Sequence, residues 1–125
     1  MILDTNAVSA FGFGESSVAK VAARHTTLYL PAVVLGEYWF GLIGSTRRVE
    51  TERWLEYFLE GVEVLDIRRS TAIKFAKIRR ALKDAGTPIP INDVWVAALA
   101  SEHGLPVLSR DEHFDLVKWL RRVTW

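Results

Sequence analysis

The chain has 125 residues, of which 50% are hydrophobic and 25% are charged, and its formal net charge is +1 at pH 7. This length and composition exclude a disordered or fibrous chain and predict a single domain over residues 1–125, while the absence of cysteine excludes disulfides, thiolate zinc sites and a cysteine nucleophile. No apolar run approaches the roughly 20 residues that span a bilayer, and the first 20 residues carry no signal pattern, so we expect a soluble, cytoplasmic protein without a membrane partner.

Strand-like and helical segments alternate along the chain. It opens on a short apolar strand, Met1–Leu3, which ends in the turn-forming residues Asp4, Thr5 and Asn6. Four later segments are β-prone and stand between helices, at residues 27–30, 62–67, 106–109 and 121–125. Six segments have helical periodicity or helix-terminating residues, at 15–24, 31–43, 47–60, 70–85, 94–103 and 111–117. This alternation predicts a three-layer α/β fold with a mainly parallel central sheet flanked by helices.

Helix caps are predicted at two of these starts. Ser45 or Thr46 is suited to begin the helix over residues 47–60, and Asn92 or Asp93 the helix over residues 94–103. The second of these helices, VWVAALASEH, is apolar nearly all round and is therefore expected to be buried.

Four carboxylates stand at positions where solvent-facing acids are not expected. Asp4 and Asp111 follow predicted strands, and ligands of parallel α/β sheets bind outside the carboxyl ends of strands. Glu37 and Asp93 lie on helix faces that are otherwise apolar, where an unpaired carboxylate is costly to bury. Each position also has a structural explanation: a turn or cap for the three aspartates, and the edge of an apolar stripe for Glu37.

Convergence of these four acids would require a cation, because their charges repel one another. An all-oxygen set of ligands suits Mg²⁺ or Mn²⁺ rather than zinc. Carboxylates that hold one or two such ions can activate water and stabilise in-line displacement at a phosphodiester. The sequence alone does not show whether the four carboxylates lie close together in the fold.

Other chemistries lack their motifs. The sequence contains no G-x-S-x-G, G-x-G-x-x-G or P-loop pattern, and its three histidines have no paired metal spacing, so His103 and His113 are expected at the surface. A receiver domain would carry an acidic pair after the first strand and a lysine where Arg110 stands. A phosphatase of the haloacid-dehalogenase type would need an acid in place of Asn6.

Four segments in order resemble the PIN-domain nucleases, and more narrowly the VapC toxins of toxin–antitoxin pairs: ILDTNAVS, VVLGEYWFG, INDVWVAALA and VLSRDEHFD. The resemblance covers essentially the whole chain. It implies an endoribonuclease that depends on one or two Mg²⁺ or Mn²⁺ ions, cuts RNA, forms a homodimer and is neutralised by a small antitoxin, with which it forms a larger hetero-oligomer. A non-catalytic PIN-like module that binds RNA or protein, and a PIN nuclease of RNA processing without an antitoxin, remain alternatives.

The resemblance also assigns roles to individual residues. The implied catalytic and metal-binding quartet consists of Asp4, Glu37, Asp93 and Asp111. The implied supporting residues are Thr5, Asn6, Ser109 and, as an additional acid found in some members, Asp115.

Basic and aromatic residues suggest where partners bind. Residues 68–83 contain seven basic residues and no acid, so Lys77 and Arg80 are candidates for phosphate contacts, although such a face is usually just solvated. Arg110, next to Asp111, is a candidate contact to the scissile phosphate. Trp39 and Trp54 are candidates for lining a groove for the antitoxin or the dimer mate, with core packing as the alternative.

Overall fold

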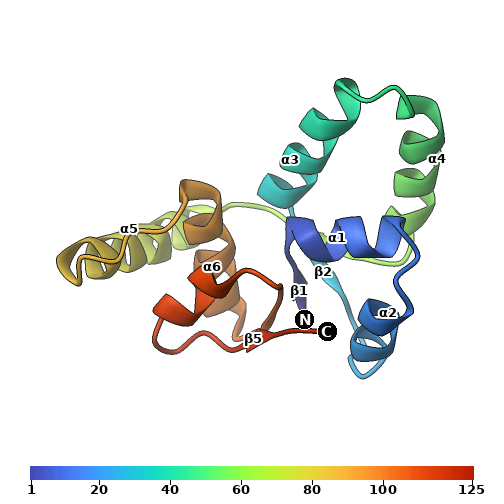
Figure 1. Ribbon diagram of the computed structural model, residues 1–125. Coiled ribbons are helices and arrows are strands. Elements are labelled where there is room, and N and C mark those ends of the chain that lie inside the picture. The colour runs from blue at the N-terminus through green and yellow to red at the C-terminus, as the bar shows by residue number, and fades with distance from the viewer.

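The computed structural model describes residues 1–125 and has five short parallel strands at its centre (Figure 1). These are β1 (Ile2–Leu3), β2 (Tyr29–Pro31), β3 (Glu63–Leu65), β4 (Val107–Leu108) and β5 (Arg122–Val123). They form one sheet in the order β3-β2-β1-β4-β5, in which every neighbouring pair is parallel. The predicted three-layer α/β fold is therefore confirmed, and its sheet is entirely parallel.

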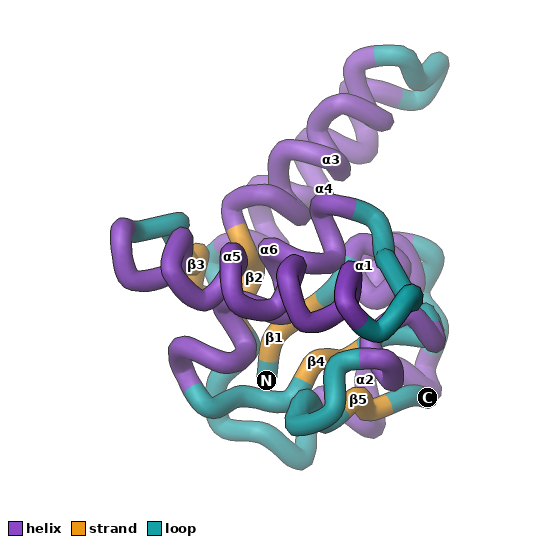
Figure 2. Tube along the Cα trace, turned by 90° about the vertical axis from the view of Figure 1, so that its left-hand side faces the viewer, coloured by secondary structure: helices purple, strands orange, loops and turns teal.

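Six α-helices and one 3₁₀ helix flank the sheet. They are α1 (Thr5–Gly12), α2 (Ser16–Ala22), α3 (Ala32–Ile43), α4 (Arg48–Leu59), α5 (Arg69–Asp84), α6 (Ile91–His103) and the 3₁₀ helix η1 (Glu112–Leu116). The α3–α4 pair projects together from the rest of the molecule in two perpendicular views (Figures 1 and 2). None of the helices has the length and apolar character that a membrane span requires.

Helix α1 is absent from the sequence-based prediction, which treats Asp4, Thr5 and Asn6 as a turn. In the structure Asp4 is the N-cap residue, with φ −87° and ψ 167°, and the chain passes from β1 into α1 without a loop. Asp, Thr and Asn favour turns and helix starts for the same reason, because their short polar side chains compete for nearby backbone groups. The prediction of a turn is therefore wrong, because these residue types do not distinguish a turn from the start of a helix.

Both predicted sets of caps are also wrong. Arg47 is the N-cap residue of α4, and the Ser45 hydroxyl instead accepts a hydrogen bond from the Arg47 backbone N–H at 3.1 Å. Helix α6 begins at Ile91 after Pro90, whose fixed φ is suited to a helix start. Asn92 and Asp93 therefore lie inside the first turn of α6 rather than before it.

The main core surrounds the two central strands. All four residues of β1 and β4 have no exposed surface, and they pack with buried residues of α1, α3 and α6. A second cluster joins α5 to α6 and includes Ile78, Leu82 and Val94. The apolar character of α6 is explained by its place between these two clusters, because it must bury side chains on both sides.

Candidate active site at the carboxyl edge of the sheet

The candidate site lies at the carboxyl edge of the sheet, beside β1 and β4. Strand β1 pairs with β2 on one side and with β4 on the other, and an open parallel sheet forms a ligand crevice where its strand order reverses in this way. Leu3 is in register with Leu108, so the residues that follow them, Asp4 and Ser109, meet at this edge. The Ser109 hydroxyl donates a hydrogen bond of 2.7 Å to Asp4 Oδ2.

Asp4 is the most buried acid of the chain, with 5% of its surface exposed. Although it is the N-cap residue of α1, its carboxylate makes no capping hydrogen bond and instead accepts from Ser109 and from Asn6 Nδ2, the latter at 2.7 Å. Burial raises the pKa of Asp4 above its ordinary value, the Ser109 hydrogen bond lowers it, and the charges of Asp111 and Glu37 raise it again. Uncharged hydrogen-bond donors therefore orient the Asp4 carboxylate without neutralising its negative charge.

Glu37 projects from the middle of α3, and a neutral donor holds each of its carboxylate oxygens. Thr5 Oγ1 donates to Oε2 at 2.8 Å, and Asn92 Nδ2 donates to Oε1 at 2.5 Å. The sequence indicates Asn92 only as a helix cap, so its contact with Glu37 is missed there. The signal available in the sequence is that Asn92 stands next to Asp93 at the start of a buried helix.

Asp93 lies in the first turn of α6, and 15% of its side chain is exposed. Burial is the main cause that raises its pKa from 3.8 to about 6, and the negative charges of Asp4 and Asp111 add to it. Contact with His113 acts in the opposite direction. A carboxyl group with this pKa gains a large part of its charge only near neutral pH or when a cation is present.

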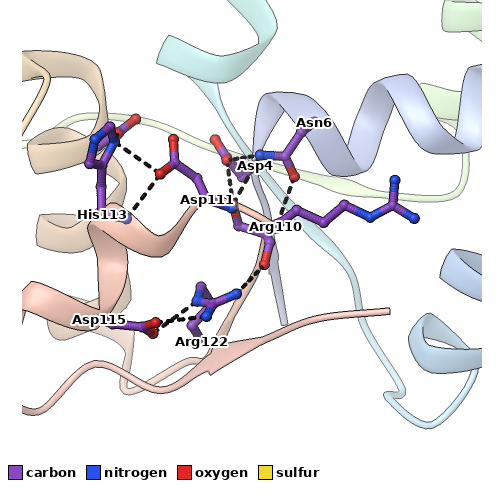
Figure 3. A network of polar contacts seen from close by, with 9 residues as sticks. Asp4, Asn6, Arg110, Asp111, His113, Asp115 and Arg122 are labelled. Atoms are coloured by element: carbon purple, nitrogen blue, oxygen red, sulfur yellow. Dashed lines mark hydrogen bonds and ion pairs between the residues drawn. The ribbon is translucent and has the colours of Figure 1, made fainter.

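Asp111 is the N-cap residue of η1, where its Oδ1 accepts a hydrogen bond from the His113 backbone N–H at 2.9 Å. This turn brings the His113 ring over the acids, so that Nδ1 lies 2.9 Å from Asp111 Oδ1 and 3.2 Å from Asp93 Oδ2 (Figure 3). His113 is half-exposed, as the sequence predicts, but its contact with two of the acids is not predicted.

All four predicted acids line one open cleft of about 1130 Å³. Its other lining residues are neutral: Thr5, Asn6, Ser9, Val33, Gly36, Phe40, Pro90 and Asn92. Because no lysine or arginine lines the cleft, the protein supplies no positive side chain there to balance the carboxylates. Oxygen donors of this kind, clustered and partly desolvated, fit a hard divalent cation such as Mg²⁺ or Mn²⁺.

Asp115 and Arg110 are among the predicted site residues that do not line this cleft. Asp115 makes two hydrogen bonds to the Arg122 guanidinium, at 2.8 and 2.6 Å. The Arg110 side chain points away from Asp111, pairs with Glu15 at 2.7 Å and lies over the Trp125 ring (Figure 3). Only the Arg110 backbone N–H contacts the site, where it donates to Asn6.

The predicted phosphate-binding residues of α5 are both exposed. Arg80 pairs with Asp84 at 3.0 Å on the same helix, and Lys77 lies on the solvent side of α5. The structure therefore places neither side chain against the acidic cleft, and their contact with RNA stays a prediction.

A second groove, of about 580 Å³, lies between α1, α3 and α4. Trp54 lines it and also packs against the main core, whereas Trp39 does not line it, so a role for either tryptophan in binding a partner stays a prediction. Thr5, Ser9 and Glu37 line both this groove and the acidic cleft, so the two hollows adjoin each other.

A parallel sheet with a carboxylate-lined cleft at its carboxyl edge indicates one class of protein, and the similarity of this chain to known proteins identifies that class. Residues 1–120 match the PIN domain, so the chain belongs to the PIN-domain family. Within the family it is of the VapC type: it is 36% identical to Ribonuclease VapC5 of Mycobacterium tuberculosis over 118 residues, which cover 90% of this chain and 84% of that protein.

Solved structures give the same result for the fold. The crystal structure of DNA-bound VapBC from Salmonella typhimurium matches with a TM-score of 0.91 and 25% identity, over 99% of this chain and 96% of that chain. VapBC2 from Rickettsia felis, bound to a promoter DNA fragment, matches with a TM-score of 0.90 and 23% identity, over 99% and 97%. At this identity the second match concerns the fold alone.

Proposed function

We propose that the protein is a divalent-metal-dependent endoribonuclease that acts as the toxin of a toxin–antitoxin pair. The observation that carries this proposal is the convergence of four carboxylates, from four separate elements, in one cleft without a basic side chain. The curated relative with 36% identity is a VapC ribonuclease, which supports RNA as the substrate.

In this proposal one or two Mg²⁺ or Mn²⁺ ions bind between the quartet carboxylates: Asp4, Glu37, Asp93 and Asp111. A bound ion of this kind lowers the pKa of water and stabilises charge at a phosphodiester. The chain itself supplies orientation. Thr5 and Asn92 fix the two oxygens of Glu37, while Ser109 holds Asp4, so the ligand set needs little rearrangement when a cation binds.

RNA cleavage by the purified chain tests the proposal directly. We expect cleavage with Mg²⁺ or Mn²⁺, none in excess EDTA, and a loss of about 100-fold or more in Asp4→Asn and in Asp93→Asn with an unchanged circular dichroism spectrum. The matched control is Asp66→Asn, an exposed acid that does not line the cleft, and this variant should keep wild-type activity. Full activity in either quartet variant, or in EDTA, would refute the metal mechanism.

The same experiment separates the proposal from a non-catalytic module. A binding module would retain undiminished RNA binding in the quartet variants and would not cleave RNA at any metal concentration.

The antitoxin partner is supported by the VapBC complexes among the similar structures. We expect a segment of a small antitoxin to occupy the groove between α1, α3 and α4, because exposed apolar side chains such as Phe13 line it and the groove adjoins the acidic cleft. An antitoxin bound there would obstruct the carboxylates.

Induction of the chain alone in a bacterial host tests this role. Growth arrest that is relieved by Asp93→Asn, and also by co-expression of a small protein encoded next to this chain, is the expected result. Harmless expression of an active enzyme would instead indicate a PIN nuclease of general RNA processing.

A further inference from the structure

His113 lies outside the carboxylate quartet, and its ring contacts the carboxylates of two quartet members. Its ring nitrogen Nδ1 lies 2.9 Å from Asp111 Oδ1 and 3.2 Å from Asp93 Oδ2. These three ligand-type atoms all lie within 4.8 Å of one another. The oxygen-only ligand set assumed for the proposed function therefore omits a nitrogen donor that is already in place.

The separations agree with those of ligands around one ion. In octahedral coordination at about 2.1 Å, neighbouring ligand atoms are separated by about 3 Å. The two distances from Nδ1 to the carboxylates match this edge length. A side-chain nitrogen and two carboxylate oxygens this close together can share one cation when Nδ1 carries no proton.

The backbone explains why the ring is held there. Asp111 caps η1 by accepting the His113 backbone N–H, so the residue two positions after the carboxylate is turned back over it. Because 47% of the His113 side chain is exposed, an ion can reach Nδ1 from solvent.

We propose that His113 Nδ1 is a metal ligand together with Asp93 and Asp111, and that it makes this position selective for Mn²⁺ over Mg²⁺. This inference rests on the proposed metal-dependent function and deepens it. Mg²⁺ binds oxygen ligands almost exclusively, whereas imidazole nitrogen is a good ligand for first-row transition ions, among which Mn²⁺ is the hardest and the most tolerant of carboxylates. A mixed nitrogen and oxygen set therefore favours Mn²⁺.

Metal binding to the full chain, stripped of metal, tests the inference without a measurement of cleavage. Electron spin-echo modulation of bound Mn²⁺ should show a directly coordinated nitrogen in the wild type and lose it in His113→Ala. By calorimetry, we expect His113→Ala to weaken Mn²⁺ binding by about tenfold or more and Mg²⁺ binding by less than about threefold. His113→Gln, which keeps a polar side chain of similar reach, should lose the nitrogen signal in the same way.

His103→Ala is the matched control, because His103 lies near Glu102 at the other end of α6 and should leave the nitrogen signal intact. A wild-type protein without nitrogen modulation, or an equal loss of Mn²⁺ and Mg²⁺ affinity in His113→Ala, would overturn the inference and leave His113 as an ion-pair neighbour of the acids.

Asp93→Asn distinguishes this failure from failure of the proposed function. If Asp93→Asn weakens Mn²⁺ binding while His113→Ala does not, only the role of His113 is wrong. If Asp93→Asn binds Mn²⁺ as the wild type does, the cleft is not the metal site, and both the inference and the metal mechanism fall.

Discussion

Two acids of the cleft, Asp4 and Glu37, are oriented by neutral side chains. Asp4 accepts from Ser109 and Asn6, and Glu37 accepts from Thr5 and Asn92, with no arginine or lysine involved. An ion pair with a basic residue would neutralise a carboxylate and compete with a cation, whereas an amide or hydroxyl donor fixes its direction and leaves its charge available. Asp115, which is paired with Arg122, illustrates the opposite arrangement outside the cleft.

Removal of one such donor should weaken metal binding without unfolding the protein. In Asn92→Ala, Glu37 loses the hydrogen bond to Oε1, so its carboxylate must be ordered by the metal itself. We expect Mn²⁺ affinity measured by calorimetry to fall about tenfold. Ser101→Ala, on the same helix but outside the cleft, is the control and should bind as the wild type does. Equal affinities for the two variants would show that Asn92 does not position Glu37.

The raised pKa of Asp93 makes a prediction for the metal-free protein. The folded state holds the Asp93 proton up to a pH of about 6, while the unfolded chain releases it near 3.8, so stability falls as the pH rises from about 3.8 to about 6 and the full cost is present above pH 6. Asp93→Asn removes that cost. In EDTA at pH 7.5 the variant should exceed the wild type in unfolding free energy by about 1–2 kcal/mol, after allowance for solvent screening, and the difference should vanish towards pH 4.

Urea unfolding at the two pH values measures this difference, with Asp66→Asn as the control, which should change stability by less than about 0.5 kcal/mol. A variant that is less stable than the wild type at pH 7.5 would mean that Asp93 contributes to the fold through its contacts rather than opposing it through its charge.

At the scale of elements, strands and long helices follow from the sequence, whereas the junctions that build the site do not. All five predicted strands and the helices from α2 to α6 are present. Within the site, the wrong assignments fall at Asp4 and at Asn92 and Asp93, where a strand or a proline leads directly into a helix. These residues have the types that favour turns or caps, but Asp4 pairs with Ser109 and Asn92 pairs with Glu37, and such long-range pairing is not encoded in local periodicity.

Two glycines in helical segments should respond in opposite directions to alanine. Gly104 ends α6 with φ +64°, a conformation that a side chain disfavours, so Gly104→Ala should cost about 1 kcal/mol. Gly41 lies inside α3 with nothing within 4 Å of an added Cβ, and Gly41→Ala should stabilise the protein by about 0.5–1 kcal/mol. Urea unfolding measures the free energy of unfolding of both variants. A change of the same sign in the two would contradict this account of the two glycines.

At the scale of the whole molecule, the near-neutral net charge conceals two unlike regions. Acids gather in the cleft at the sheet edge, while helix α5, which packs along α6 in the second core cluster, carries exposed basic residues such as Lys77. The acidic charges therefore lie at the proposed active site, whereas the basic charges lie on a surface that can bind a polyanion.

The acidic cleft also opposes the stability of the metal-free molecule, and this leads to a prediction about cation binding. An ion that binds only the folded state stabilises it by mass action, by about 2.7 kcal/mol at 100 times its Kd. Protons compete for the same carboxylates, and Asp93, with a pKa of about 6, is largely protonated at pH 5.5. The increase in Tm on addition of 1 mM Mn²⁺ should therefore be several degrees at pH 7.5 and much smaller at pH 5.5. Asp4→Asn, which removes a ligand at the centre of the cleft, should abolish the increase at both pH values. An increase of equal size at pH 5.5 and 7.5 would place the stabilising ion away from these carboxylates.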